Sequence, residues 1–325
     1  MKGFLARNPA TILCAALIAV ILCGHFCFGL FPVPRYQAPT ANRWQAALVE
    51  RYRSMGLTGD ALGTVSALTL GYKGDLDRGV IQSFQRSGAA HVLAVSGLHT
   101  GLVYVMIVFL ITLGKKIKPL YESTFWRALQ SVLILLLLWG YAVLTGLSPS
   151  VVRSALMLTL VEIARFCSRP PLTLNIVLFS AALILAFRPS DLFNVSFQLS
   201  YSAVISIVAF SPLFTKHRTP YTKHPLCAKL GRFIFDLVWV SMAAQLGTIP
   251  FTLYYFHQLS NYFLLTNLIV LPLATILVPL GLATLVLGTV PYLGTILVWC
   301  LQKGTELMLI AVNWVQSLPG AFVQF

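Results

Sequence analysis

Long apolar runs alternate with short polar stretches along most of the chain. About nine runs are long enough to cross a bilayer, because roughly 20 apolar residues span its hydrocarbon core. They cover residues 10–31, 92–113, 128–146, 150–167, 171–187, 192–213, 233–256, 262–288 and 292–316. This pattern predicts an all-α, polytopic membrane protein. Pro272 and Pro279 interrupt the eighth run, which leaves a broken helix or a re-entrant hairpin open there.

Composition agrees with this class and excludes an ordinary soluble domain. Hydrophobic residues make up 58% of the chain and charged residues 10%, and the mean hydropathy is +0.82. The net charge is +14, which suits anionic lipid and polyanionic partners alike. Most of this excess follows the inside-loop bias of bacterial multi-span proteins.

The basic loops predict the orientation of the chain. Lys and Arg gather after the second, fourth and sixth runs, and the opposite short loops carry only Arg188. We therefore expect a bacterial inner-membrane protein with a cytoplasmic N-terminus. Residues 1–35 are predicted to be a retained membrane anchor, because no small-x-small cleavage site follows the first run. Residues 36–90 are predicted to form amphipathic helices on the outer membrane surface.

The most informative polar cluster lies at the start of the second run, in A-A-H-V-L-A-V-S-G-L-H-T-G from Ala89 to Gly101. Polar side chains at a membrane boundary are costly unless they find partners or serve a function. Contact with a polyanion's phosphates at a helix N-terminus and burial in the helix bundle both remain open. The candidate residues in this cluster are His91, Ser96, Gly97, His99 and Gly101.

Four later groups of residues extend the candidate site. Arg153 lies one turn inside the fourth run, where it could bind phosphate or extend to the membrane surface. Polar residues recur on one face of the sixth run. Others lie in the seventh and eighth runs, near prolines that leave backbone carbonyls without their helical hydrogen bonds. Such stripes either line an aqueous path or bond neighbouring helices together. The residues are Asn194, Gln198, Ser202, Gln245, Pro250, Asn267 and Pro272.

Four sequence blocks resemble the ComEC competence family, over about residues 65–285. The first runs from A-L-T-L-G-Y-K-G-D-L-D at Ala67 into H-V-L-A-V-S-G-L-H-T-G-L at His91. The second is Y-A-V-L-T-G-L-S-P-S-V-V-R-S-A-L-M from Tyr141, and the third is R-P-S-D-L-F-N-V-S-F-Q-L-S-Y from Arg188. The fourth is A-A-Q-L-G-T-I-P-F-T-L-Y-Y-F-H-Q-L-S from Ala243, followed by T-N-L-I-V-L-P-L from Thr266.

This resemblance implies that residues 91–325 form a competence-type transmembrane channel domain that passes single-stranded DNA into the cytoplasm during natural transformation. It also implies membrane lipid and the DNA-receptor, nuclease and motor proteins of the competence machinery as partners, and it leaves a homo-oligomer open. The family's fullest members add an oligonucleotide-binding domain and a nuclease domain, and neither pattern fits this sequence. We therefore expect a C-terminally truncated relative with no catalytic residue, metal or cofactor.

Two other functions remain open from the sequence. Broken spans also suit a small-solute transporter, although no inverted repeat is detectable. An intramembrane serine hydrolase would use Ser96 as nucleophile, activated by His99 or by a histidine such as His257. That alternative lacks a G-x-S-x-G motif and leaves the other three blocks unexplained.

Overall fold

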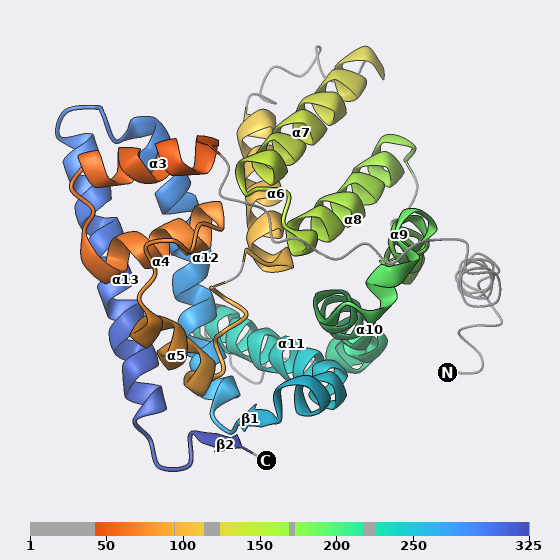
Figure 1. Ribbon diagram of the computed structural model, residues 1–325. Coiled ribbons are helices and arrows are strands. Elements are labelled where there is room, and N and C mark those ends of the chain that lie inside the picture. The colour runs from red at the N-terminus through yellow and green to blue at the C-terminus, as the bar shows by residue number, and fades with distance from the viewer. Residues whose placement is uncertain (1–42, 94, 114–123, 169–172, 217–224, 325) are drawn as a thin grey trace. The chain divides into compact units, whose positions relative to one another are not determined.

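The computed structural model describes residues 43–93, 95–113, 124–168, 173–216 and 225–324, and nearly all of its elements are helices (Figure 1). The chain divides into two compact units. The described part of the first covers residues 156–256, and that of the second covers residues 43–155 and 257–324.

The second unit contains most of the helices. In chain order they are α3 (Arg43–Ser54), α4 (Gly59–Leu70), α5 (Arg78–Ser87), α6 (Gly97–Thr112), α7 (Thr124–Leu144), the start of α8 (Pro149–Phe166), α12 (Phe263–Leu287) and α13 (Leu293–Gln316). Helices α12 and α13 pack closely along each other, and α4 and α5 pack against them. Strands β1 (Gln258–Ser260) and β2 (Phe322–Gln324) form an antiparallel pair in which Leu259 lies opposite Val323.

The first unit is built from the rest of α8 and three further helices: α9 (Thr173–Phe187), α10 (Val195–Lys216) and α11 (Pro225–Phe256). A short 3-10 helix, η3 (Pro189–Phe193), joins α9 to α10. The apolar core of this unit lies between α9 and α10, where Val177, Ala181 and Leu185 meet Phe197 and Tyr201. Helix α11 packs along α10.

A helix occupies each of the eight predicted apolar runs after residue 90, and the first run, 10–31, lies outside the described residues. Among the described residues, five helices are long and apolar enough to cross a membrane: Thr124–Leu144, Val195–Leu213, Gly231–Phe256, Phe263–Leu287 and Leu293–Gln316. Helices α6 and α9 have 16 and 15 residues, fewer than an untilted span needs. Membrane crossing by α6, α8 and α9 stays a prediction.

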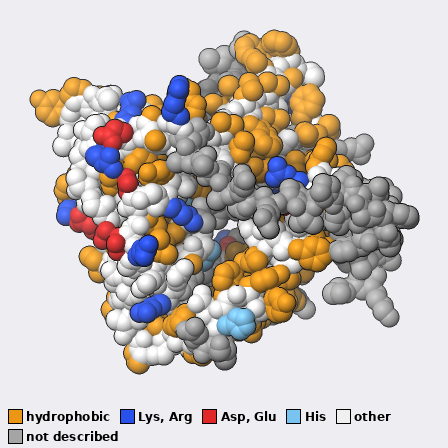
Figure 2. All heavy atoms as spheres, in the orientation of Figure 1, with side chains coloured by type: hydrophobic (Ala, Val, Ile, Leu, Met, Phe, Trp, Pro, Cys, Tyr) orange, Lys and Arg blue, Asp and Glu red, His pale blue; other side chains and the backbone are white. Residues whose placement is uncertain are grey.

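The surface of the long helices supports a membrane protein. Large apolar side chains on α7, such as Phe125, Leu129 and Leu136, are 70%, 44% and 65% exposed. Figure 2 shows hydrophobic side chains over much of the visible face, with charged side chains gathered mainly over the region of α3 to α5. Exposed apolar helix faces of this extent are stable in lipid and not in water. The chain is therefore an all-α, multi-pass membrane protein in its described part.

The expectation of a broken eighth segment is wrong. Helix α12 runs without interruption from Phe263 to Leu287, although Pro272 and Pro279 lie inside it. Each proline removes one helical N–H and so leaves a carbonyl one turn earlier without its usual partner. The helix tolerates this loss because α4, α6 and α13 pack against it.

The prediction of amphipathic helices in residues 36–90 agrees with α3 and α5 but not with α4, and their place on the outer membrane surface stays a prediction. Helix α3 buries one stripe, Gln45, Val49 and Tyr52, and α5 likewise buries one face. Every residue of α4 from Ala61 to Leu70 is buried. Threonine and serine at three of these positions made α4 resemble an amphipathic helix, although its polar side chains also face protein.

Candidate functional site

The buried C-terminal end of α4 organises the first sequence block. Gly71 adopts a left-handed conformation, with φ of 72°, and its N–H donates to the carbonyl of Ala67. The N–H of Tyr72 donates to the carbonyl of Ser66. This L-G-Y ending is a glycine C-cap, which satisfies carbonyls that a helix end leaves without partners.

Side chains from two other helices satisfy the last carbonyls of α4. The hydroxyl of Tyr141 on α7 donates to the carbonyl of Thr69 at 3.2 Å. The amide of Gln45 on α3 donates to the carbonyl of Leu70 at 2.8 Å. Since Tyr141 opens the second block, this contact joins the first two blocks, 72 residues apart in sequence. Every partner is buried, so losing one would leave an unsatisfied carbonyl, at a cost of about 1–3 kcal/mol.

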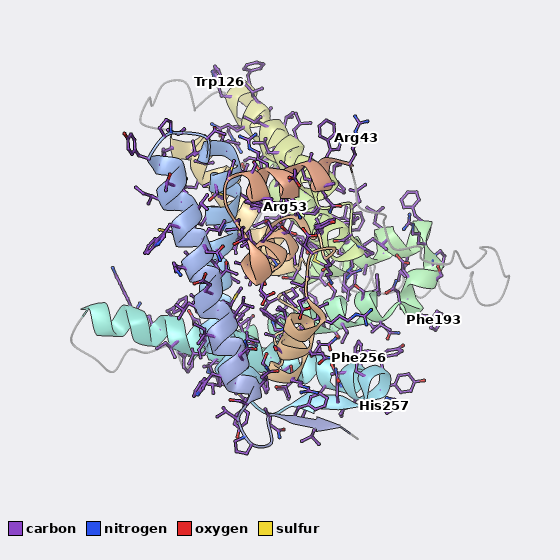
Figure 3. All side chains as sticks on the ribbon, turned by 60° about the vertical axis from the view of Figure 1, so that its left-hand side comes forward. Arg43, Arg53, Trp126, Phe193, Phe256 and His257 are labelled. Atoms are coloured by element: carbon purple, nitrogen blue, oxygen red, sulfur yellow. The ribbon has the colours of Figure 1, made fainter. Side chains whose placement is uncertain are left out.

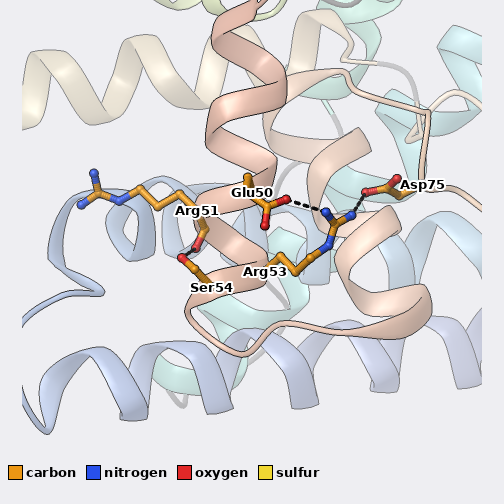
Figure 4. Close-up of polar contacts among 5 residues, drawn as sticks. All are labelled: Glu50, Arg51, Arg53, Ser54 and Asp75. Atoms are coloured by element: carbon orange, nitrogen blue, oxygen red, sulfur yellow. Dashed lines mark hydrogen bonds and ion pairs between the residues drawn. The ribbon is translucent and has the colours of Figure 1, made fainter.

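Besides the bond from Gln45, a second buried contact and an exposed one hold helix α3 on this site. The phenol of Tyr52 is fully buried and donates to the hydroxyl of Thr69 at 3.3 Å. Burial raises the pKa of Tyr52, and the hydrogen bond to Thr69 offsets this only in part, so the phenol remains a donor. On the exposed side, Arg53 bridges Glu50 and Asp75 (Figure 4), which ties α3 to the loop after α4.

A fully buried histidine, His99, lies in the first turn of α6. The backbone N–H of Ser96 donates to Nδ1 of His99 at 3.0 Å, and the Ser96 hydroxyl lies 3.1 Å from the same nitrogen. Serine and histidine thus form a capping box for the first turn of α6. His99 is 0% exposed, and its Nε2 has no hydrogen-bond partner among the described residues.

The start of α12 lies against the end of α5. The hydroxyl of Thr266 donates to the carbonyl of Ser87 at 2.6 Å. The next residue, Asn267, is 7% exposed, and its Oδ1 has no hydrogen-bond partner in the described part of the chain. His91 is exposed in the turn between α5 and α6. We call this set the polar junction: Ser87, His91, Ser96, His99, Thr266 and Asn267.

Arg153 lies one turn inside α8, and Gly97 is the first residue of α6. Arg153 is 4% exposed, so it is buried in protein and does not extend to the membrane surface. A Cβ built on Gly97 would lie 2.9 Å from the hydroxyl of Ser154, which places the start of α6 beside the first turn of α8. At Gly101, by contrast, a Cβ would meet nothing within 4 Å, so close packing does not require glycine there.

The polar stripe of α10 bonds mainly to its own backbone. Asn194 accepts from the N–H of Ser196 at 2.9 Å, and Gln198 donates to the carbonyl of Leu192 at 2.9 Å. Ser202 donates to the carbonyl of Leu199 at 3.2 Å. The bonds of Asn194 and Gln198 lie where η3 ends and α10 begins. An aqueous path along the stripe stays a prediction.

The remaining candidates lie on α11 and α12. Gln245 is half-buried on α11 and Pro250 is exposed on the same helix, which continues past it to Phe256. Pro272 is half-buried inside α12, one turn and a half beyond Asn267. The structure therefore brings the first two blocks together with Thr266 and Asn267 in the second unit, whereas Asn194, Gln198, Ser202, Gln245 and Pro250 belong to the first unit.

The contact between Ser96 and His99 has the geometry of a helix N-terminal cap. A hydrolase base would take the serine proton with a free nitrogen, but Nδ1 already accepts the backbone N–H of Ser96. The other alternative base, His257, is exposed in the turn between Phe256 and β1 (Figure 3). Within the described ranges, no group of three or more His, Cys, Asp or Glu side chains could hold a metal ion.

Sequence reasoning missed several residues that build this site. Gln45, Tyr52 and Thr69 carry its buried hydrogen bonds, and Tyr141 was noted only as the first letter of a block. The spacing of Gln45, Val49 and Tyr52 was the available signal, since it puts a glutamine and a tyrosine on the apolar stripe of an amphipathic helix.

Comparisons with known proteins agree with these blocks. The family model described as competence protein matches residues 68–325. ComE operon protein 3 of Bacillus subtilis is 33% identical over 221 residues, which cover 66% of this chain and 25% of that protein. Recombination protein 2 of Haemophilus influenzae is 28% identical over 249 residues, covering 74% and 30%. The uncharacterized protein YcaI of Escherichia coli is 26% identical over 225 residues, covering 68% and 28%.

The chain thus spans less than a third of the length of these relatives. No solved structure matches it significantly. The family match extends over more than three quarters of the chain and includes all four blocks except Ala67, the first residue of the first block. The chain therefore belongs to the competence protein family.

Proposed function

We propose that this chain forms the membrane-spanning part of a channel that passes single-stranded DNA across the bacterial inner membrane during natural transformation. Membership of the competence family supports a role in natural transformation. Five candidate spans among the described residues support a location in the membrane. The name of one relative, Recombination protein 2, refers to recombination. A DNA receptor, a motor and a nuclease would be separate partners, and this chain would perform no covalent chemistry.

One observation carries the assignment of the site. Two buried contacts join distant segments within the second unit: Tyr141 of the second block bonds to Thr69 of the first, and Thr266 bonds to Ser87, 179 residues earlier. Two polar atoms there, His99 Nε2 and Asn267 Oδ1, are buried without partners in the described part of the chain. Unsatisfied buried groups are rare in packed interiors and are retained where a site needs them. The junction is therefore the proposed gate of the channel, with His91 at its exposed edge.

Deletion of the gene is the direct test of this function. In the organism that carries the chain, labelled duplex DNA is added and external nuclease removes the DNA that remains outside. We expect nuclease-resistant label to disappear in the deletion strain and to return when the gene is restored. Unchanged internalisation of DNA would reject the channel, and an altered accumulation of small solutes instead would favour a transporter.

Arg153 gives a sharper prediction. Replacing it by alanine should lower DNA internalisation per molecule of protein by at least about tenfold, because a buried guanidinium can bind phosphate in a fixed geometry. Lysine keeps the charge but not the planar fork, so Arg153→Lys should retain only part of the activity. The variants are compared by nuclease-resistant label, normalised to membrane abundance from immunoblots.

The control for this prediction is Arg78→Ala, which removes an exposed arginine from the start of α5 in the same unit. It should leave internalisation within about twofold of the natural chain, because surface substitutions usually change little. If Arg153→Ala loses abundance in proportion to activity, Arg153 has a structural role and the DNA-contact assignment is wrong.

The orientation of the chain is tested separately. Reporters fused after Lys223 should show cytoplasmic activity, and reporters fused near Thr58 should show exported activity, because cationic loops resist export. Alkaline phosphatase and a fluorescent protein that fails to mature outside the cytoplasm give opposite signals at each position. Reversed signals would place the polar junction in the opposite half of the membrane and would overturn the inward direction proposed for DNA.

A further inference from the structure

Gln45 is a buried glutamine on the apolar stripe of α3, and it contacts two other segments of the second unit. It is 5% exposed, and its amide donates to the carbonyl of Leu70 at 2.8 Å. The same amide lies against Gly146, because a Cβ on Gly146 would be 3.2 Å from Nε2 and 3.4 Å from Oε1 of Gln45. Gln45 therefore lies between the end of α4 and the turn that follows α7.

The turn beside Gln45 leads directly into α8. Gly146 and Leu147 have positive φ, 73° and 51°, and the N–H of Leu147 donates to the carbonyl of Ala142 at 2.9 Å. The chain thus folds back at the end of α7, as in a helix C-cap. Pro149 then begins α8 with a fixed φ, so the direction of the turn sets where the helix starts. Because the amide of Gln45 packs against this turn, it helps to fix the start of α8.

Arg153 lies one turn inside α8 and moves with the start of that helix. Only two residues separate Gly146 from α8, so the helix carries a shift of the turn to Arg153. The start of α8 lies beside that of α6, since a Cβ on Gly97 would be 2.9 Å from the hydroxyl of Ser154. Arg153 is 4% exposed, so its guanidinium can bind phosphate in only a restricted geometry. A displacement of about 1 Å is enough to weaken such a contact strongly.

We propose that Gln45 is a positioning residue, which holds Arg153 in place through the turn between α7 and α8. Helix α3 thereby sets the affinity of the site for the phosphate groups of single-stranded DNA. This inference rests on the proposed function, since it takes Arg153 as the phosphate ligand. Gln45 itself does not touch the strand, because its side chain is buried against protein.

A neighbouring hydrogen bond provides a matched control. The hydroxyl of Tyr141 donates to the carbonyl of Thr69 at 3.2 Å, so Tyr141→Phe removes one partner from the end of α4. Gln45→Met keeps the length of glutamine and likewise removes the donor to the carbonyl of Leu70. Of the two variants, only Gln45→Met changes the side chain nearest to Gly146. The pair therefore separates loosening of α4 from displacement of the turn.

The affinity is measured with a fluorescent single-stranded oligonucleotide and the full chain in lipid nanodiscs. Gln45→Met should raise the Kd at least about fivefold, and Gln45→Leu, a second variant without the donor, should act alike. Tyr141→Phe should leave the Kd within about twofold, although it lowers the temperature of thermal unfolding by a similar amount. Equal weakening of binding by Gln45→Met and Tyr141→Phe would overturn the positioning role.

Combination with Arg153→Ala tests whether Gln45 acts through Arg153. Arg153→Ala alone should raise the Kd at least about tenfold, and adding Gln45→Met should change it by no more than about twofold, because the positioned side chain is already gone. Effects that multiply in the double variant would reject the inference and leave Arg153 as a phosphate ligand. A Kd unchanged by Arg153→Ala would instead reject Arg153 as the ligand, and the role of Gln45 would fall with the proposed site.

Discussion

Replacing Gly247 by alanine is expected to lower the membrane abundance of the chain several-fold. A Cβ at this position would lie 2.5 Å from the carbonyl oxygen of Ser202 and 2.6 Å from Cβ of Ser206 on α10. The two helices would have to move apart, which would also stretch the 2.6 Å hydrogen bond from Ser206 to the carbonyl of Ala243 one turn earlier. Overpacking of this kind costs about 1–3 kcal/mol, enough to change steady-state abundance several-fold.

The same helix offers a matched control for this substitution. A Cβ on Gly231 meets nothing within 4 Å, so Gly231→Ala should leave abundance unchanged or slightly raised. Quantitative immunoblots of the membrane fraction and thermal unfolding in detergent compare the two variants. Equal behaviour would show that α10 and α11 do not pack closely in the membrane.

Hydropathy predicted the helices well because membrane-spanning segments need no long-range information. Each run must satisfy its own backbone hydrogen bonds within lipid, so a long apolar run predicts a helix by itself. The proline-containing α12 shows where this reasoning was too cautious. Pro272 and Pro279 weaken an isolated helix, but packing of neighbouring helices against α12 keeps it continuous.

Helix α4 shows the opposite difficulty. Its segment, G-D-A-L-G-T-V-S-A-L-T-L, mixes polar and apolar residues and therefore resembles a surface helix. The structure nevertheless buries it. Thr69 bonds to Val65 and Tyr52, and the end carbonyls of the helix are satisfied by Gln45 and Tyr141. The hydroxyls of Thr64 and Ser66 are buried without a partner among the described residues. Gln45, Tyr52 and Tyr141 come from elements before and after α4 in the chain, and no local pattern identifies them.

The candidate site could be located in the sequence but not assembled from it. Polar residues at span boundaries marked Ser96, His99, Arg153 and Asn267 because such residues are costly in lipid. Periodicity gives the face of a helix on which a residue lies and not the element it faces. For this reason the predicted stripe of α10 carried no information on whether Gln198 lines water or, as the structure shows, donates to the carbonyl of Leu192.

Two substitutions of His99 separate its structural nitrogen from its unpartnered one. Asparagine places an acceptor oxygen near the position of Nδ1, so His99→Asn should keep the bond from the Ser96 N–H while losing Nε2. Alanine loses both. An N-terminal cap is worth about 1 kcal/mol, and truncation of a fully buried side chain adds a cavity, so His99→Ala should reduce abundance together with activity.

For His99→Asn we expect membrane abundance within about twofold of the natural chain and DNA internalisation lower by at least about tenfold. The physical reason is that Nε2 is buried at the polar junction without a hydrogen-bond partner in the described residues, which packing alone would not favour. Nuclease-resistant label per molecule of protein is the measurement. Normal internalisation by His99→Asn would show that the capping bond is the whole role of His99. The gate would then have to be sought elsewhere, beginning with Arg153 and Asn267, which are buried near the starts of α8 and α12.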